Sequence, residues 1–95
     1  MFARVTTVAT PPDRLEESIR VTREAAPRAR QIPGSKGVYF LVDTASSKGV
    51  VITLWESQRA LDASQEEANR IRAETVAKIG GLILSVEEYE VVVQP

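Results

Sequence analysis

Residues 36–56, KGVYFLVDTASSKGVVITLWE, decide the fold class because they join two strand-forming segments by one short turn. Lys36–Asp43 and Gly49–Glu56 are rich in β-branched and aromatic residues, which favour extended backbone. Thr44–Gly49 is polar and ends in glycine, a pattern that is typical of a hairpin. The stretch therefore predicts two neighbouring antiparallel strands in the middle of the chain.

The segments around this hairpin predict a strand and a helix before it, and helices and a strand after it. In chain order, we expect a strand over Phe2–Ala9, a helix over Asp13–Arg30, the hairpin strands, a short helix over Gln58–Ala63, a longer helix over Gln65–Ile79 and a strand over Leu82–Val93. This order, β-α-β-β-α-β, predicts an α+β fold of the ferredoxin-like type in a single domain over residues 1–95. Such a domain has a four-stranded antiparallel sheet with both helices on one face.

Two helix starts carry candidate capping residues. Thr10 precedes Pro11-Pro12 and belongs to the residue types whose side chains accept a hydrogen bond from a first-turn amide. Ser64 stands three residues before Glu67, which gives the form of a capping box at the start of the longer second helix. We therefore expect both side chains to act as helix caps.

Composition argues against several classes of function. The 12 basic and 13 acidic residues are interspersed, so the chain lacks the basic surface that nucleic-acid binding requires. No segment is apolar over the length of a membrane span and the N-terminus does not resemble a signal peptide, so we expect a cytoplasmic protein without membrane contacts. Cysteine and histidine are absent, which removes disulfides, the commonest metal ligands and the commonest general base. We expect neither a metal nor a cofactor.

Strand alternation predicts a second apolar surface. When helices cover only one face of a sheet, the other face is normally polar. Here we expect small aliphatic residues under the helices and a mainly apolar set on the open face: Phe2, Val8, Tyr39, Leu41, Val51 and Trp55. Because such a patch marks an interface or a ligand site, we expect two copies to pack sheet to sheet as a homodimer.

Three short motifs carry a family resemblance: Gly37–Asp43, then Thr53–Ser57 (Thr-Leu-Trp-Glu-Ser), then Ala60-Leu61. Together with the order of the elements, they resemble the antibiotic biosynthesis monooxygenase-like family of dimeric α/β barrels. The resemblance implies several activities, because some members convert aromatic polyketides to quinones without a cofactor and others degrade haem. The haem-degrading members carry an asparagine on the first strand and a histidine after the tryptophan. This chain has no histidine, and its one asparagine, Asn69, lies on a helix, so haem binding is disfavoured.

Five residues are candidates for binding a small molecule: Tyr39, Trp55, Arg72, Arg4 and Thr53. Trp55 could stack on a planar ring and Tyr39 could donate a hydrogen bond to it, and we expect both to line one cavity with Thr53. Arg72 lies at the edge of an apolar helix face and Arg4 projects from the first strand, so either guanidinium could hold an anionic oxygen. The plainer alternatives are core or interface packing for the aromatic residues and a solvated head group for the arginines.

No catalytic residue is identifiable, because cofactor-free oxygenation needs a proton acceptor and no buried carboxylate is evident. Three functions stay open. The first is an oxygenase acting on a hydrophobic phenolic or polycyclic molecule, and the second is a non-catalytic binding or accessory dimer with the same cavity. The third is a structural or regulatory partner domain. The missing base favours the second over the first, whereas a cavity containing Trp55 and an inward arginine would favour ligand binding over the third.

Overall fold

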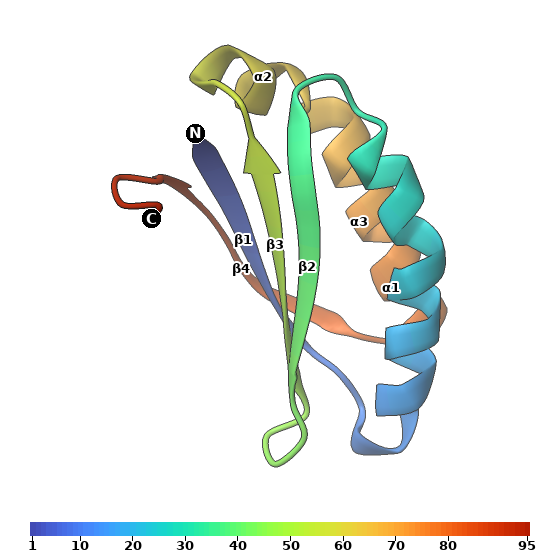
Figure 1. The fold of residues 1–95 in the computed structure, drawn as a ribbon. Coiled ribbons are helices and arrows are strands. Elements are labelled where there is room, and N and C mark those ends of the chain that lie inside the picture. The colour runs from blue at the N-terminus through green and yellow to red at the C-terminus, as the bar shows by residue number, and fades with distance from the viewer.

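The computed structural model describes residues 1–95 and confirms the expected order of elements (Figure 1). The elements are β1 Phe2–Ala9, a 3-10 turn η1 Pro12–Arg14, α1 Leu15–Arg30, β2 Ser35–Asp43, β3 Lys48–Trp55, α2 Gln58–Ala63, α3 Gln65–Ile79 and β4 Leu82–Glu90. The strands form one antiparallel sheet in the order β2-β3-β1-β4. The two long helices α1 and α3 lie side by side on one face of this sheet, which confirms the ferredoxin-like arrangement.

The last strand is shorter than expected, because it ends at Glu90 and not at Val93. Glu90 pairs with Phe2, the first residue of β1, and one further backbone hydrogen bond, from the Val91 amide to the Met1 carbonyl oxygen at 2.8 Å, reaches the start of the chain. The first α-helix also begins later than Asp13, since Pro12–Arg14 forms a 3-10 turn before it. Both differences are shifts of two or three residues at the ends of correctly placed elements.

Both expected helix caps are wrong. The residue before the first helical turn is Pro11, and the hydroxyl of Thr10 has no hydrogen-bond partner. Ser64 joins α2 to α3 in helical conformation, so it lacks the extended backbone of a capping residue, and its hydroxyl donates to the carbonyl oxygen of Leu61 at 2.6 Å. The side chain that does cap a helix is that of Ser57. Its backbone is extended, and its hydroxyl oxygen accepts a hydrogen bond from the backbone amide of Ala60 in α2 at 3.0 Å.

The strand register reverses the expected faces of β1 and β3. Directly opposed residues of an antiparallel pair share a face, and Trp55 stands opposite Phe2 while Val51 stands opposite Thr6. Val51 and Trp55 line the space under the helices together with Val8, so their expected position on the open face is wrong. Alternation separates two sets of side chains within a strand, but pairing decides which sets of neighbouring strands share a face.

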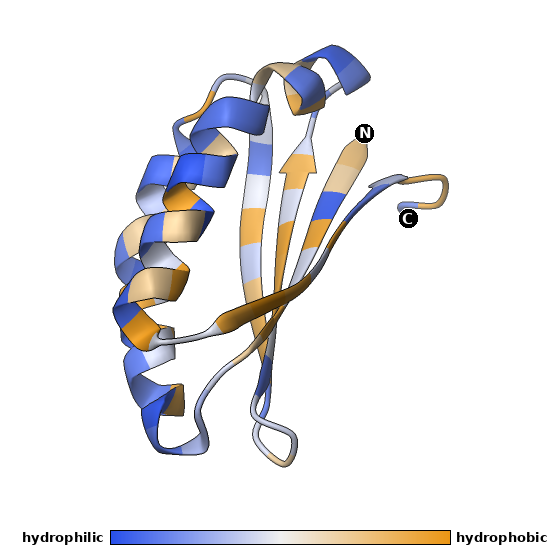
Figure 2. Ribbon diagram, turned by 180° about the vertical axis from the view of Figure 1, so that it is seen from behind, coloured by the Kyte–Doolittle hydropathy of each residue, from blue (hydrophilic) through white to orange (hydrophobic).

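The open face is nevertheless apolar. Tyr39 stands opposite Ile52 and Leu41 opposite Val50, so the two β2 residues lie on this face as expected. They are 58% and 49% exposed. Figure 2 shows the first part of β4, coloured hydrophobic, leaving the helix layer and crossing in front of the other strands. The open face of the sheet therefore combines aliphatic side chains on the central strands with exposed apolar side chains on the edge strands.

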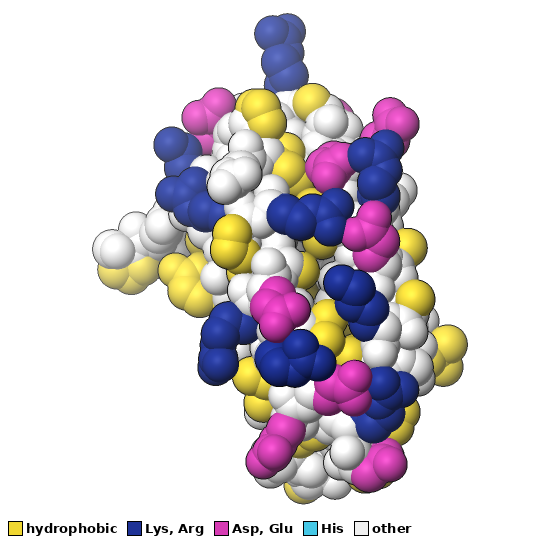
Figure 3. All heavy atoms as spheres, turned by 90° about the vertical axis from the view of Figure 1, so that its right-hand side faces the viewer, with side chains coloured by type: hydrophobic (Ala, Val, Ile, Leu, Met, Phe, Trp, Pro, Cys, Tyr) yellow, Lys and Arg dark blue, Asp and Glu magenta, His cyan; other side chains and the backbone are white.

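The outer surface of the helix layer carries charges of both signs, which lie interspersed in Figure 3. Arg28 of α1 pairs with two carboxylates of α3, at N···O distances of 2.6 Å to Glu74 and 3.6 Å to Glu67. These pairs tie the two helices together above the sheet. No helix in the structure has the length and hydropathy of a membrane span.

Candidate functional site

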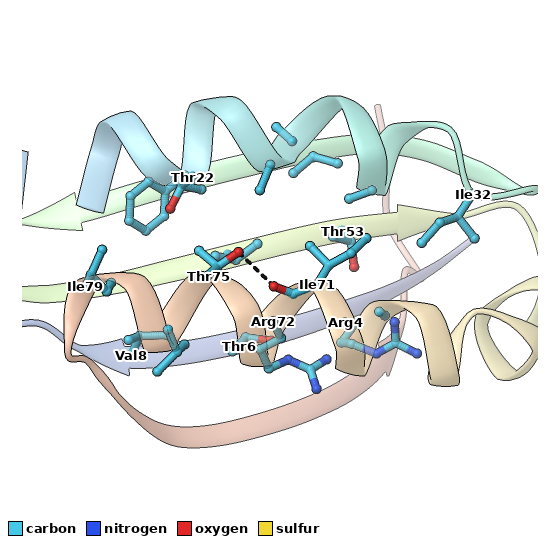
Figure 4. A pocket seen from close by; sticks show the side chains of 18 of the residues that line it. Arg4, Thr6, Val8, Thr22, Ile32, Thr53, Ile71, Arg72, Thr75 and Ile79 are labelled. Carbon is cyan, nitrogen blue, oxygen red and sulfur yellow. Dashed lines mark hydrogen bonds between the residues drawn. The ribbon is translucent and has the colours of Figure 1, made fainter. Parts of the chain in front are cut away.

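A cleft lies between the covered face of the sheet and the two long helices (Figure 4). It measures about 820 Å³ when the solvent at its mouth is included. Strands β1, β2 and β3 form its floor, and α1 and α3 form its walls. Because 13 of its 20 lining residues are hydrophobic, the cleft has the usual composition of a small-molecule site, mainly apolar with a few polar groups.

Small side chains on one wall keep the cleft open. α1 contributes Ala25, Ala26 and Ala29, none of which extends beyond Cβ. The opposite wall carries larger side chains from α3, among them Ile71 and Ile79, which are 7% and 3% exposed. The alanine wall leaves space that a row of leucines would fill, so the cavity follows directly from the composition of α1.

On the floor, the ring of Phe40 in β2 packs against Gly49 in β3. A Cβ atom at residue 49 would stand 2.6 Å from the nearest ring carbon, which is too close for any real contact. The glycine therefore allows the ring to lie directly on the backbone of the neighbouring strand. This close approach lowers the floor of the cleft at the position of Phe40.

Trp55 and Thr53 line the same cleft, which lies under the helices and not on the open face where Trp55 was expected. Trp55 is 1% exposed, and its indole Nε1 donates to the hydroxyl oxygen of Thr53 at 3.0 Å. The guanidinium carbon of Arg4 lies 5.6 Å from the centre of the indole ring, within the range of a cation–π contact. Because its one donor is already used, Trp55 offers a ligand ring surface and no hydrogen bond.

Arg4 lines the cleft but is fully engaged by the protein itself. Its Nη2 atom donates to the carbonyl oxygen of Leu61 at 3.1 Å and to Gln65 Oε1 at 3.0 Å. Nη1 donates to Ser64 Oγ at 3.1 Å, and Nε donates to Glu88 Oε2 at 3.2 Å, in an ion pair with that carboxylate. With 2% of its surface exposed, Arg4 joins β1 to β4 and to the junction of α2 and α3. This arrangement suits a structural role.

Arg72 is the cation that the fold leaves available. It lines the cleft from α3, is half-buried, and its one side-chain hydrogen bond is to Asn69 Oδ1 at 2.6 Å, on the exposed side. Burial lowers the pKa of Arg72, the nearby charge of Arg4 lowers it further, and Glu88 opposes both effects. A guanidinium remains charged at neutral pH even so. Figure 4 shows its head group on the same side of α3 as that of Arg4.

Tyr39 does not belong to the cleft, which corrects the expectation that it shares a cavity with Trp55. Since Tyr39 stands opposite Ile52, and Val38 opposite Thr53, the tyrosine points away from the helices. It lines a separate, shallow depression beside α1, together with Arg23 and Arg30. The tyrosine hydroxyl therefore cannot act on a molecule held beside Trp55.

Threonine hydroxyls supply most of the other polar atoms of the cleft. Five threonines line it: Thr6, Thr10, Thr22, Thr53 and Thr75. Thr75 donates to the carbonyl oxygen of Ile71 at 2.8 Å, drawn as the dashed line in Figure 4, and Thr53 accepts from Trp55. Of the five, the sequence alone pointed only to Thr53. The correct face assignment for β1 would have placed Thr6 and Thr10 there as well.

The family model described as antibiotic biosynthesis monooxygenase matches residues 1–74. The chain belongs to this family. The matched range includes β3 with Trp55 and most of α3, so the elements that build the cleft are family elements. The resemblance carried by the Thr53–Ser57 motif is thereby confirmed.

Curated relatives match nearly the whole chain, and solved structures share its fold. Uncharacterized proteins of Mycobacterium tuberculosis are 30% identical over 92 residues, which are 96% of this chain but only 39–41% of theirs. The chain thus spans about two fifths of the length of these relatives. A Nitrosomonas europaea protein with the same family description superposes with a TM-score of 0.75, at 16% identity, over 98% of this chain and all of the other. The haem-degrader MhuD of M. tuberculosis, solved with two haems in its active site, superposes with a TM-score of 0.73 at 21% identity, over 100% of this chain and 99% of the other.

Proposed function

We propose that this protein binds a flat, mainly apolar small molecule with an acidic hydroxyl in the helix–sheet cleft, and oxygenates it with dioxygen and no bound cofactor. The single observation that carries the proposal is an apolar cleft with one cation at its side, Arg72, whose only side-chain hydrogen bond is to Asn69. The alanine wall and the indole ring of Trp55 suit a planar, apolar ring system, because neither has a free hydrogen-bonding group. Family membership supports the oxygenation.

The ionisable groups of the cleft define what kind of substrate could react there. Its lining contains no carboxylate, imidazole or phenol, and Arg4 and Arg72 are its two ionisable residues. The protein therefore supplies a cation and a dry surface but no side-chain base. A substrate suited to this site loses its proton easily and binds as an anion, with its charged oxygen against Arg72.

The chemistry then proceeds on the substrate itself. The bound carbanion or enolate passes one electron to dioxygen, and the two radicals combine to form a carbon–oxygen bond. The proton that the substrate gave up to water returns from water to the peroxide anion, and the hydroperoxide then loses water, so a CH₂ group and O₂ yield a carbonyl group and H₂O. The contribution of the protein is to exclude solvent and to stabilise the anion, both of which act electrostatically in an apolar site.

Haem, which the M. tuberculosis haem-degrader binds, does not fit the side chains of this cleft. An iron ligand here would have to be an imidazole, a thiolate, a thioether or a phenolate. The chain has no histidine or cysteine, and neither its single methionine nor its two tyrosines are among the cleft residues. We therefore derive no step through a haem group.

The open face supports a homodimer as part of the same proposal. Tyr39 and Leu41 are about half exposed there, next to the aliphatic central strands. Removing apolar surface from water is favourable by about 25 cal/mol per Å², which opposes the entropic cost of association. Packing two sheets face to face leaves the helices outside and both clefts accessible, which is the geometry of a dimeric α/β barrel.

Anthrone is a suitable probe, since its CH₂ group is acidic and its oxidation product is anthraquinone. The wild-type protein should quench Trp55 fluorescence on binding, consume oxygen and form anthraquinone faster than buffer alone. Arg72→Met should weaken binding or turnover about tenfold to a hundredfold, the range for a hydrogen bond to a charged group. Arg70→Met is the matched control, because Arg70 is an exposed residue of α3 that pairs with Glu66 and Glu67 outside the cleft.

One alternative is favoured by a specific observation. Since the cleft offers no side-chain base, the protein could bind the same class of molecule without converting it. Quenching of Trp55 without oxygen uptake would support this binding or accessory role. If no planar phenol or anthrone quenches the tryptophan, both ligand functions are wrong and an interaction domain is the better description.

A further inference from the structure

Thr10, the residue that follows β1, carries a buried hydroxyl that nothing in the protein satisfies. The residue is 5% exposed, and its Oγ1 atom has no hydrogen-bond partner. Its backbone amide is paired, donating to the carbonyl oxygen of Ser47 at 2.9 Å, so only the side chain is left over. The helix start beside it does not use the hydroxyl either, since the capping position is Pro11.

An orphaned hydroxyl of this kind is costly and uncommon. Leaving a buried donor or acceptor unpaired costs about 1–3 kcal/mol, and most buried polar groups in proteins have a partner. Valine has the same shape as threonine without the hydroxyl, so a purely structural role would be better served by valine. The presence of an unpaired hydroxyl at Thr10 is therefore explained if its hydrogen-bond partner is a ligand from outside the chain.

The position of Thr10 identifies where that partner would lie. Arg4, Thr6, Val8 and Thr10 follow one another at every second position, and all four line the cleft. The four residue-to-residue steps from Thr6 to Thr10 span about 13 Å at a rise of about 3.3 Å per residue. In Figure 4, Val8 and Ile79 lie toward one end of the cleft and Arg4 toward the other, with Arg72 between them beside Thr6. Thr10 follows Val8 in the chain, on the far side of Val8 from Thr6 and Arg72.

The second orphaned hydroxyl of the chain provides an internal comparison. Ser35 is 7% exposed and its Oγ atom also lacks a partner, but it is not a cleft residue. It lies at the start of β2, where its carbonyl oxygen accepts from Arg30. Ser35 and Thr10 thus share the energetic cost of an unpaired hydroxyl, and only Thr10 is placed where a ligand could remove that cost.

We propose that Thr10 is a specificity residue that hydrogen-bonds a hydroxyl or carbonyl group at the end of the ligand remote from Arg72. The inference rests on the proposed ligand-binding function and deepens it, because it defines the class of ligand. That class is an elongated planar molecule with an acidic oxygen at one end, a hydrogen-bonding oxygen at the other and an apolar middle. Flavones, in which two rings are joined through a heterocycle, are available probes of this elongated shape.

Two flavones that differ in one oxygen test this assignment. 7-Hydroxyflavone has an acidic phenol at one end only, whereas 4′,7-dihydroxyflavone carries a second hydroxyl at the other end. Titration followed by Trp55 fluorescence should show that wild-type protein binds the dihydroxy compound about tenfold more tightly, as expected for one buried hydrogen bond of about 1.4 kcal/mol. Thr10→Val should abolish this preference, because it removes the hydroxyl that the second phenol would bind.

Two further variants separate ligand recognition from folding. Thr10→Ser keeps the hydroxyl and should keep the preference, while Ser35→Ala removes the other orphaned hydroxyl and should also keep it. A preference that persists in Thr10→Val, or a wild-type protein that binds both flavones equally, overturns the role of Thr10 but leaves the proposed function standing. A wild-type protein that binds neither flavone nor anthrone overturns both.

Discussion

The two faces of the sheet differ in a way that is opposite to simple expectation. The face under the helices carries an arginine, threonines and a tryptophan among its apolar residues, whereas on the uncovered face the central strands carry mainly aliphatic residues such as Val50 and Ile52. A sheet face that is packed solidly against helices is normally aliphatic, and an uncovered face is normally polar. The reversal indicates that the covered face is built around a cleft, and that the uncovered face is suited to a flat partner such as a second sheet.

The largest expected effect comes from breaking the polar core of the covered face. Arg4→Met would leave Glu88, Ser64, Gln65 and the Leu61 carbonyl without their shared donor. Breaking a buried charged network by removing one partner typically costs about 3–5 kcal/mol, and the partial exposure of Glu88 places this case near the lower end. Denaturant unfolding measures the loss. The control is Arg59→Met, at an exposed position of α2.

If Arg4→Met unfolds with nearly wild-type stability, Arg4 is not a structural residue. It would then compete with Arg72 as the anion-binding group of the cleft.

The uncovered face is tested by placing a charge at its centre. In Ile52→Lys, each copy of a sheet-to-sheet dimer would bury an ammonium group without a partner, at a cost of several kcal/mol per copy. We expect sedimentation velocity to show a dimer for the wild-type chain and a monomer for the variant, with helical circular dichroism retained. Val92→Lys, beyond β4 and 82% exposed, is the control. A wild-type chain that is monomeric at micromolar concentration contradicts the proposed assembly.

A smaller effect distinguishes the hydroxyls within the covered face. Thr53→Val removes the acceptor of the Trp55 indole and leaves a buried donor unpaired, so it should destabilise the fold by about 1–3 kcal/mol. Thr10→Val removes an unpaired group and should not destabilise it. Thermal unfolding of the two variants, compared with the exposed turn variant Thr44→Val, measures both effects. Equal destabilisation by both substitutions would show that Thr10 has an internal partner in solution.

The smallest expected effect concerns the helix layer that covers the cleft. The hydrogen bond from Arg28 lowers the pKa of Glu74, so the folded state favours the ionised carboxylate. Its contribution to stability is present above the pKa of the unfolded state and is lost as pH falls through the lower pKa of the folded state. Glu74→Gln should therefore flatten the acid side of a stability–pH profile slightly, and salt should diminish the difference. An unchanged profile at low salt would show that this pair does not stabilise the helix layer.

Local sequence patterns predicted the elements well, because strand composition, helical periodicity and turn residues act over short ranges. The bounds of β1, α2 and α3 follow from those patterns without correction. The face assignment failed because Trp55 and Tyr39 lie on different strands, and only the pairing register shows that they point in opposite directions. The partners of Arg4 were equally invisible, since Glu88 and Ser64 are 84 and 60 residues away in sequence.

The candidate site was therefore predicted in part. Arg72, Trp55 and Thr53 line one cleft, but only for Arg72 did the pattern of its own helix indicate an inward position, whereas Trp55 was expected on the open face. Thr10 was misread as a helix cap because its residue type and the following prolines suit that role equally well. The difference depends on where the chain turns after β1, which is a tertiary property.

The contact between Gly49 and Phe40 makes the depth of the cleft adjustable from outside the set of residues that line it. Any side chain at position 49 must displace the Phe40 ring, because even a Cβ atom would stand 2.6 Å from it. An alanine there would push the ring upward and shorten the space available to a bound molecule. Residue 49 thus controls the depth of the cleft. Substituting it would change the size of molecule that the cleft can hold, while Arg72, Trp55 and Thr10 stay unchanged.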